Sequence, residues 1–544
     1  MKDRTDEGKG ISRRDFVKGA AAGVGVAAVA AEGGWLRAQA EEATAKPKPP
    51  EDLVQGVPSI AASQIKERVT ADIVVVGAGI SGFCASLSAA EAGAKVVQIE
   101  KGAHYTARGF DNGCIDSKVH KAAGVKLDKE EIIDECLRCA NYRVDQRLLR
   151  LWADNSGAAM DWLVDHIQTE GMVARLNSDK IFPWGPYKHY PTAVCFPDAQ
   201  GNVMGGNVRI MPHMEKLVKA GGVDLRYQHP AVQLVRVNGG RVTAVVAKNP
   251  AGDYTQFSAR KGIILCSGGY DNSPEMMKKY LRPSDLRIRL YESPNKVSTG
   301  DGHNMGLAIG ADMDEPPHVF MVGSGTLINN ENFYLLFHPF LRVDKLGQRY
   351  MNENVDYCRQ ANATSVLPGH FNWTILDGNW KDSLGEEYGR ESSGYVASLE
   401  KQMNEYIGEH FILKADTVED LARAMKADPA AFRATVDRYN ELAKLKQDPD
   451  FGKSPEHLVA LDKAPYYAIN TGAFSLVTVS GLKINTKLQI LDLGGNPIPG
   501  LYGAGNVTGG FFSDTYPRNV GGISHGRAIT FGRLAALSAV AEKG

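Results

Sequence analysis

A glycine-rich turn between two apolar runs is the feature that most constrains the fold of this chain. Ile73–Val76 is a β-branched run typical of a buried parallel strand. The G-x-G-x-x-G pattern of Gly77, Gly79 and Gly82 follows at once, and an Ala/Ser-rich helical segment leads to a second strand ending at Glu100. Helix-start N–H groups hold pyrophosphate, and an acidic residue after the second strand accepts ribose hydroxyls. The sequence therefore predicts a Rossmann-like βαβ unit that binds a dinucleotide.

The N-terminal residues have the features of an export signal. The stretch SRRDFVK at 12–18 resembles the twin-arginine consensus, a short apolar run covers 20–31, and a small-residue cleavage pattern ends at Ala40. The apolar run is shorter than the roughly 20 residues of a membrane span. We expect a twin-arginine (Tat) signal peptide at 1–40, a Pro-rich tether at 41–68, and a mature protein in the periplasm or on the outer face of the cytoplasmic membrane. Anchoring without cleavage is the alternative.

Charge and cysteine content argue against several classes of function. The formal net charge of −1 gives no long-range attraction to nucleic acid, so no nucleic-acid partner is expected. The 7 cysteines are an odd number, so at least one is unpaired within the chain. Cys136 and Cys139 lie one turn apart in a helical pattern without further ligands at short spacing, and we expect no metal site. The sequence has no C-x-x-C-H motif for covalent haem and, after the signal, no expected integral membrane span.

Motifs further along the chain resemble, in the same order, those of the fumarate reductase and succinate dehydrogenase flavoprotein family. The stretches that carry the resemblance are GGVDLRYQHPAVQLVRVNGG, KGIILCSGGYDNSPEM, STGDGHNMGLAIGADM, LGQRYMNE and GLYGAGNVTGG. The resemblance spans roughly residues 70–540 and implies FAD as the dinucleotide. The loop histidine that carries a covalently linked flavin in that family is not matched cleanly, and His104 is the only nearby candidate. We therefore expect noncovalent FAD.

The resemblance also implies the domain organisation. That family splits its FAD-binding domain around an inserted domain, so we expect an α/β fold with a Rossmann-like FAD-binding domain and an α+β capping domain. We place the FAD-binding domain at 69–280 and 465–541 and the capping domain at 281–464. Two helices are predicted in the cap, with Thr417 as N-cap and Pro429 at their junction.

The predicted cofactor contacts come from the glycine turns, the loop after the second strand, the strand-and-meander segment and the T-G-D-G helix start. As the resemblance implies them, they are Gly77, Ala78, Gly79, Gly82, Glu100, Lys101, Asp111, Asn112, Gly113, Val232, Gly268, Asp301, Gly505, Asn506, Gly522 and Ile523.

The candidate catalytic residues lie in two motifs that depart from the fumarate reductase pattern. That family places an arginine acid four residues after the N-E glutamate, whereas this sequence has Tyr357 four residues after Glu353, with Arg359 two further on. In the closing loop Tyr516 stands at the family's arginine position, and Arg518 follows two residues later. The 3-ketosteroid dehydrogenases resemble this chain in both tyrosines. We expect Tyr516 and Arg518 to bind the substrate's activating group, and either Tyr357 or Arg359 to donate a proton.

Together these features imply an exported FAD-dependent oxidoreductase that acts on CH–CH groups. We expect it to reduce an activated C=C bond of a small α,β-unsaturated carboxylate or enone as a respiratory terminal reductase. Its electrons would come from a separate donor such as a membrane-linked cytochrome c. Two alternatives stay open, namely a ketosteroid-type dehydrogenase that oxidises a C–C bond next to a ketone, and a non-enzymatic electron-transfer flavoprotein.

Overall fold

The computed structural model of the chain describes residues 56–542 with several short gaps. The predicted signal peptide (1–40) and the first part of the predicted tether (41–55) lie outside the described residues. Strand β1 begins at Ile65, inside the predicted tether, so the sheet starts earlier than expected. The gaps within the described range are 178–186, 200, 202–204, 291–295, 326, 329–330, 333, 382–383, 385–392 and 409–410.

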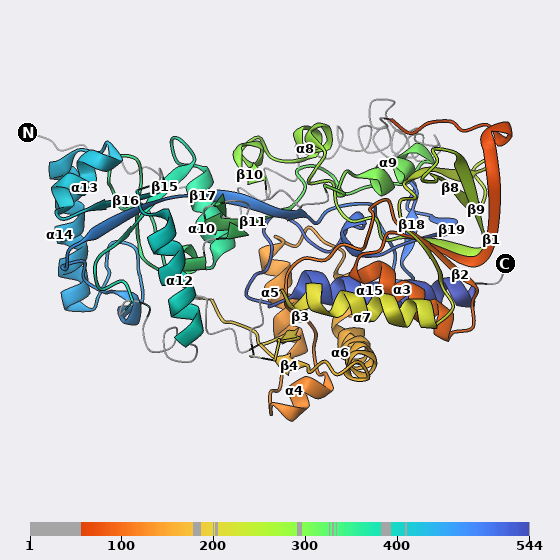
Figure 1. The fold of residues 1–544 in the computed structure, drawn as a ribbon, viewed down its shortest axis with the longest axis horizontal. Coiled ribbons are helices and arrows are strands. Elements are labelled where there is room, and N and C mark those ends of the chain that lie inside the picture. The colour runs from red at the N-terminus through yellow and green to blue at the C-terminus, as the bar shows by residue number, and fades with distance from the viewer. Residues whose placement is uncertain are drawn as a thin grey trace, which may run out of the picture. The chain divides into compact units, whose positions relative to one another are not determined.

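An eight-stranded sheet contains the predicted dinucleotide-binding unit (Figure 1). Its strand order is β18-β19-β9-β1-β2-β6, and the hairpin of β7 and β8 extends from β9. The pairs β1–β2, β1–β9, β2–β6 and β9–β19 are parallel, as crossover connections require, so the α/β fold prediction is confirmed. The strands are β1 Ile65–Val76, β2 Val96–Ile99, β6 Asp224–Arg226, β7 Ala231–Arg236, β8 Val242–Lys248, β9 Tyr254–Leu265, β18 Gln489–Leu491 and β19 Pro497–Gly503.

Three helices from distant parts of the sequence pack together beside this sheet (Figure 1). They are α3 Ile80–Glu91, α7 Gly206–Ala220 and α15 Ile523–Ala541. Glycines in α15 permit very close backbone contacts, because a Cβ at Gly532 would lie 2.4 Å from the Ser81 carbonyl oxygen of α3. A Cβ at Gly526 would lie 1.6 Å from the carbonyl oxygen of Gly113. The last helix of the chain is thereby fixed against its N-terminal βαβ unit.

Smaller elements complete the part of the fold that surrounds these helices. They are α4 Lys118–Ala122, α5 Lys129–Cys139, α6 Gln146–Gln168, α8 Pro274–Tyr280, α9 Asp301–Ala308 and the sheet of β3 Asn112–Gly113, β4 Arg175–Leu176 and β5 Ala193–Cys195. All seven cysteines are free thiols. In the described part of the chain no helix combines the length and hydrophobicity needed to cross a bilayer. The same residues contain no cluster of ligands suited to a metal ion.

A second, six-stranded sheet is organised by one long strand. β17 pairs with β10, β11, β15 and β16, and β14 joins through β15. The strands are β10 Arg289–Leu290, β11 Phe320–Gly325, β14 Leu341–Val343, β15 Phe371–Leu376, β16 Ile412–Ala415 and β17 Tyr466–Thr478, and a separate hairpin joins β12 Leu327–Ile328 to β13 Glu331–Asn332. This sheet therefore extends past residue 464, where we placed the end of the capping domain. The domain boundaries themselves stay a prediction.

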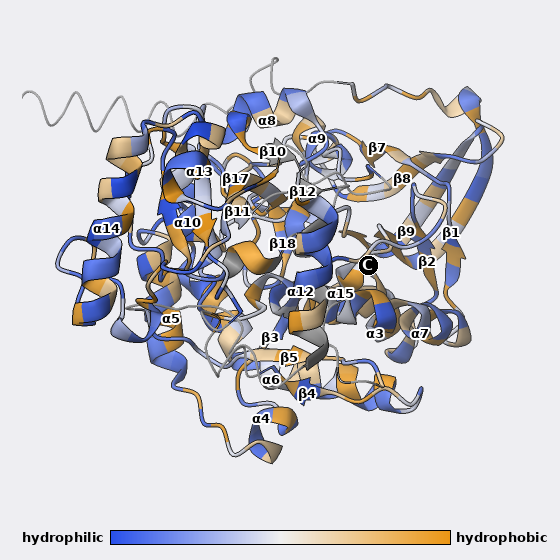
Figure 2. Cartoon of the chain, turned by 60° about the vertical axis from the view of Figure 1, so that its left-hand side comes forward, coloured by the Kyte–Doolittle hydropathy of each residue, from blue (hydrophilic) through white to orange (hydrophobic). Residues whose placement is uncertain are grey.

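Four helices pack around the six-stranded sheet, and two of them were predicted from the sequence. They are α10 Tyr357–Ser365, α12 Ser393–Tyr406, α13 Val418–Met425 and α14 Pro429–Leu445. Thr417 accepts a hydrogen bond from the Asp420 amide at the start of α13, and Pro429 occupies the first turn of α14, so both predicted boundaries are confirmed. Hydrophobic and hydrophilic residues alternate along α14 in Figure 2, as expected of a helix that is buried along one side.

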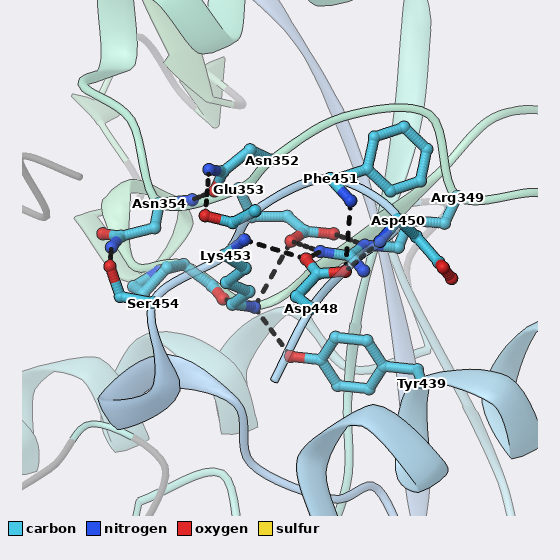
Figure 3. Close-up of polar contacts among 12 residues, drawn as sticks. Arg349, Asn352, Glu353, Asn354, Tyr439, Asp448, Asp450, Phe451, Lys453 and Ser454 are labelled. Carbon is cyan, nitrogen blue, oxygen red and sulfur yellow. Dashed lines mark hydrogen bonds and ion pairs between the residues drawn. The ribbon is translucent and has the colours of Figure 1, made fainter. Parts of the chain in front are cut away.

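A buried network of charges fixes the segment that precedes α10 (Figure 3). The fully buried carboxylate of Glu353 accepts hydrogen bonds of 2.9 and 2.8 Å from Arg349, and Lys453 Nζ lies 3.4 Å from it. Arg349 also donates to Asp448 at 2.7 Å, and Lys453 donates to the Tyr439 hydroxyl at 2.6 Å. Two cations and two anions thus balance each other, and they connect loop 448–454 to the N-E motif.

Removing the charge of Glu353 should destabilise the fold, because Glu353→Gln leaves two buried cations facing one carboxylate. We expect a loss of about 3–5 kcal/mol in the free energy of unfolding, measured by urea denaturation. Glu419, which pairs with Arg433 between α13 and α14, is partly exposed to solvent, and Glu419→Gln is the matched control with little expected effect. Equal stability of the two variants would contradict the proposed balance of buried charges.

Candidate active site

A cavity of about 520 Å³ has walls from both sheets. Val76 of β1 and Ile99 of β2 line it on the side of the eight-stranded sheet, and Met321 of β11 and Phe474 of β17 line it on the side of the six-stranded sheet. Residues at the N-terminal ends of α3, α9 and α15 also line the cavity. Helix N-termini carry partial positive charge and unpaired N–H groups, so their convergence favours an anionic ligand.

The first glycine turn forms one part of the cavity wall. Gly77 has a φ of 113°, and a Cβ there would lie 2.3 Å from the Cys266 carbonyl oxygen, so only glycine fits. Gly79 precedes α3 without a side-chain cap and has open space beside it, with the nearest atom 3.9 Å from its ideal Cβ position. The helix-start amides are therefore accessible from the cavity, as a pyrophosphate would require.

Glu100 holds the end of β2 beside that turn. One carboxylate oxygen accepts a hydrogen bond of 2.8 Å from the Ala78 amide, and the other accepts one of 2.7 Å from the Gly102 amide. Each oxygen keeps a lone pair for a further donor, so the carboxylate is able to bind ribose hydroxyls.

These features fit a bound FAD. The glycine turn suits the pyrophosphate, Glu100 suits a ribose, and the cavity volume lies within the ordinary range for cofactor sites. Phe474, Leu476 and Val477 supply an apolar wall for a flat ring.

The predicted cofactor residues divide into two groups. Those that line the cavity are Gly77, Gly79, Glu100, Lys101, Asp111, Gly268, Asp301, Gly505, Asn506 and Gly522. Those that the described lining does not include are Ala78, Gly82, Asn112, Gly113, Val232 and Ile523.

The second group has packing contacts that explain its position. A Cβ at Gly82 would lie 2.1 Å from the Gly77 carbonyl oxygen, so this glycine packs helix α3 against its own turn. Gly113 donates a hydrogen bond of 2.7 Å to the Gly522 carbonyl and lies directly against the start of α15. Ala231, the neighbour of Val232, lines the cavity in its place.

Several lining residues were missed by the sequence reasoning, among them Arg108, Ser267 and His525. Arg108 donates a hydrogen bond of 2.6 Å to the Leu476 carbonyl and pairs with Asp271, which ties the loop after β2 to the end of β17. Burial lowers the pKa of His525 to about 4, so its imidazole is neutral at pH 7. His525 follows Gly522 by three residues and lies in the first turn of α15. This position next to a predicted cofactor glycine was the sequence feature that could have identified it.

Three of the four candidate catalytic residues line the cavity, namely Tyr357, Tyr516 and Arg518. The Arg518 guanidinium carbon lies 5.1 Å from the centroid of the Tyr357 ring. Tyr516 accepts a hydrogen bond of 3.1 Å from the Ser524 amide, which leaves its own hydroxyl hydrogen available to donate. Burial raises the pKa of both phenols above their usual range, and the Arg518 charge partly offsets that rise.

Arg359, the fourth candidate, is not part of the cavity lining among the described residues. Its guanidinium pairs with Asp356, the N-cap of α10, and donates to Cys139 Sγ at 3.5 Å. The same group lies 3.8 Å from the centroid of the Tyr187 ring. These contacts give Arg359 a role in fixing the start of α10.

Neutralising Glu100 should weaken cofactor binding, because a carboxylate binds hydroxyls more strongly than a neutral amide. We expect Glu100→Gln to raise the Kd for FAD by about 10–100-fold, measured by fluorescence titration of the cofactor-free protein. Glu91→Gln, at the outer end of α3, is the control. An unchanged Kd for Glu100→Gln would mean that the carboxylate serves only the Ala78 and Gly102 amides.

The chain is similar to flavoprotein reductases over most of its length. It is 32% identical to the vinyl phenol reductase of Lactiplantibacillus plantarum over 499 residues, which covers 85% of this chain and 94% of the relative. Among solved structures, the open conformation of a flavocytochrome c3 fumarate reductase matches with a TM-score of 0.68 and 26% identity, covering 88% of this chain and 79% of that one.

A 3-ketosteroid-delta4-(5alpha)-dehydrogenase from Rhodococcus jostii RHA1 matches in fold alone, with a TM-score of 0.68 and 23% identity over 89% of this chain and 99% of that one. The family model described as an FAD binding domain matches residues 72–523. Its span includes both glycine turns and all residues that line the cavity up to Gly522. The chain therefore belongs to the FAD-binding domain family of the fumarate reductase flavoproteins and is an FAD-dependent oxidoreductase.

Proposed function

We propose that this protein reduces an activated C=C bond, in an α,β-unsaturated carboxylate, enone or similarly conjugated small molecule. The observation that carries the proposal is that Tyr357, Tyr516 and Arg518 line the same cavity as the glycine turn of the cofactor site. Two of the similar proteins named above are a vinyl phenol reductase and a fumarate reductase, and both names describe reduction of unsaturated substrates.

Bound FAD supplies hydride-transfer chemistry. Around it, this chain has to bind the group that activates the double bond and to move one proton. Arg518 offers a buried positive charge for a carboxylate or a polarised oxygen. The Tyr516 hydroxyl is held by the Ser524 amide and donates its hydrogen to the same substrate group. Both interactions strengthen as negative charge develops on that group.

Tyr357 is the better of the two candidate proton donors. Its phenol lines the cavity, whereas Arg359 is engaged with Asp356 and Cys139. Because burial raises its pKa, Tyr357 holds its proton at neutral pH, and the adjacent Arg518 stabilises the phenolate that remains after donation. The phenol then needs a new proton before the next turnover.

The pair of tyrosines also suits the reverse direction, in which a ketosteroid-type dehydrogenase oxidises a C–C bond beside a ketone. Steady-state assays with a reduced viologen donor against assays with an oxidised dye acceptor separate the two directions. A protein with no turnover in either assay would be the non-enzymatic electron-transfer flavoprotein.

We further propose export by the twin-arginine route to the periplasm or the outer face of the cytoplasmic membrane, and a separate electron donor such as cytochrome c in a respiratory chain. The N-terminal SRRDFVK stretch supports export of the folded protein. The absence of a C-x-x-C-H motif from the printed sequence supports a donor on another polypeptide. Noncovalent FAD belongs to the same proposal.

The experiment that tests the function is anaerobic mixing of the dithionite-reduced protein with a panel of enoates, enones and vinyl arenes. A substrate is expected to restore the yellow absorbance of oxidised flavin within seconds. If every compound in the panel leaves the flavin bleached while dye acceptors reoxidise it, the C=C reductase proposal fails.

Variants of the cavity residues test the assigned roles. Arg518→Ala should slow reoxidation by the best substrate by at least about 100-fold, because the developing charge loses its partner. Tyr357→Phe should slow it by about 10²–10⁴-fold, because the proton donor is removed. Both variants should keep FAD, measured by its absorbance after gel filtration. Arg359→Gln should lose much less activity than Tyr357→Phe, and the opposite order would reassign the proton donor.

A further inference from the structure

A buried arginine beside the cavity is held by neutral groups. Arg527 of α15 is fully buried. Its guanidinium donates hydrogen bonds to the carbonyl oxygens of Thr508 and Gly505, at 3.3 and 3.2 Å, and to Asn506 Oδ1 at 3.1 Å. Its Nε has no hydrogen-bond partner among the described residues. No carboxylate in the described part of the chain forms an ion pair with it.

The groups in direct contact with the Arg527 guanidinium are aromatic or neutral. The guanidinium carbon lies 5.4 Å from the centroid of the Phe511 ring and 4.8 Å from that of Phe512. Burial raises the pKa of Asp314 to about 6, so this carboxyl is mostly ionised at pH 7. Its oxygens accept hydrogen bonds from the Gly481 and Gly510 amides, and it acts on Arg527 without forming a direct ion pair. By contrast, the buried Arg349 pairs directly with Glu353 and Asp448.

A buried arginine without a direct ion pair is costly for the fold, and an anionic ligand close to it would lower that cost. Gly505 and Asn506, whose oxygens Arg527 binds, both line the cavity. Ser524 and Ala528 on the same helix line it too, so the guanidinium lies directly behind the cavity wall. In a low-dielectric interior a charge at this depth acts strongly on a ligand across the wall. The N-terminal dipole of α15 acts in the same direction.

We propose that Arg527 is an electrostatic positioning residue for FAD, whose charge favours the reduced anionic cofactor over the oxidised one and so raises the midpoint potential. The half-reaction is FAD + 2 e⁻ + H⁺ → FADH⁻, with the electrons from the external donor and the proton from solvent. Charge near the flavin ring is one of the means by which proteins tune its electronics. The inference concerns the cofactor and needs no substrate, so it stands apart from the proposed C=C reductase activity.

The competing explanation is that Arg527 only fixes the loop 505–512. Arg527→Lys keeps the charge and loses part of the hydrogen bonding, whereas Arg527→Met removes the charge and keeps an unbranched chain. Arg533→Met is the matched control, because Arg533 lies on the same helix but is partly exposed, with its guanidinium 3.8 Å from Glu91 and bonded to Ser88 Oγ at 3.2 Å. The three variants separate charge from loop support.

The test is a spectroelectrochemical titration of each FAD-loaded protein, with no substrate present. Arg527→Met should reduce the preference for reduced over oxidised FAD at least tenfold, which lowers the midpoint potential by about 30 mV for a two-electron couple. Arg527→Lys and Arg533→Met should stay within threefold of the wild type. A midpoint potential unchanged in Arg527→Met, or equally lowered in Arg527→Lys, would overturn the proposal in favour of loop support.

A measurement on the unaltered protein keeps the proposal testable if Arg527→Met fails to fold. Uptake of one proton with two electrons makes the midpoint potential fall by about 30 mV for each tenfold decrease in proton concentration, whereas uptake of two protons makes it fall by about 60 mV. At roughly neutral pH, between about 6.5 and 8.5, we expect the smaller slope. The larger slope would show that the reduced cofactor is bound neutral and would overturn the inference.

Discussion

The close approach of α15 to the N-terminal βαβ unit is the constraint on which the site depends. Gly526 lies against the Gly113 carbonyl and Gly532 against that of Ser81, at distances that no side chain would permit. This contact brings the end of the chain to its first glycine turn. As a result Tyr516 and Arg518, on the loop before α15, line the same cavity as Gly77. A larger residue at either glycine would separate the two halves of the site.

Local patterns in the sequence were sufficient to predict the parts of the fold that depend on local chemistry. The β-branched run before Gly77, the Thr417 cap and the Pro429 helix start all specify their structure within a few residues. Helix geometry also distinguishes the two candidate proton donors, Tyr357 and Arg359. Residues two apart on a helix point in directions about 200° apart, so only one of them could line a cavity beside α10.

Other features depend on contacts between segments far apart in the sequence, and no local pattern reports them. Gly82 and Gly113 belong to recognisable motifs, but their task is to allow close backbone packing, which is visible only once α3 and α15 are in place. Arg108 donates a hydrogen bond to the Leu476 carbonyl near the end of β17, and Arg527 donates one to the Gly505 carbonyl in the closing glycine turn. The extent of the six-stranded sheet has the same cause, because β17 pairs with strands far earlier in the chain, such as β10.

The pairing of β17 has an evolutionary consequence. Its backbone joins four neighbouring strands, while Phe474 and Val477 on the same strand form part of the cavity wall. Backbone hydrogen bonds do not depend on side-chain identity, so replacement of the partly buried Val477 keeps the hydrogen bonds of the sheet. Related proteins with the same sheet are thereby able to change the shape of the cavity wall through a few replacements on a single strand.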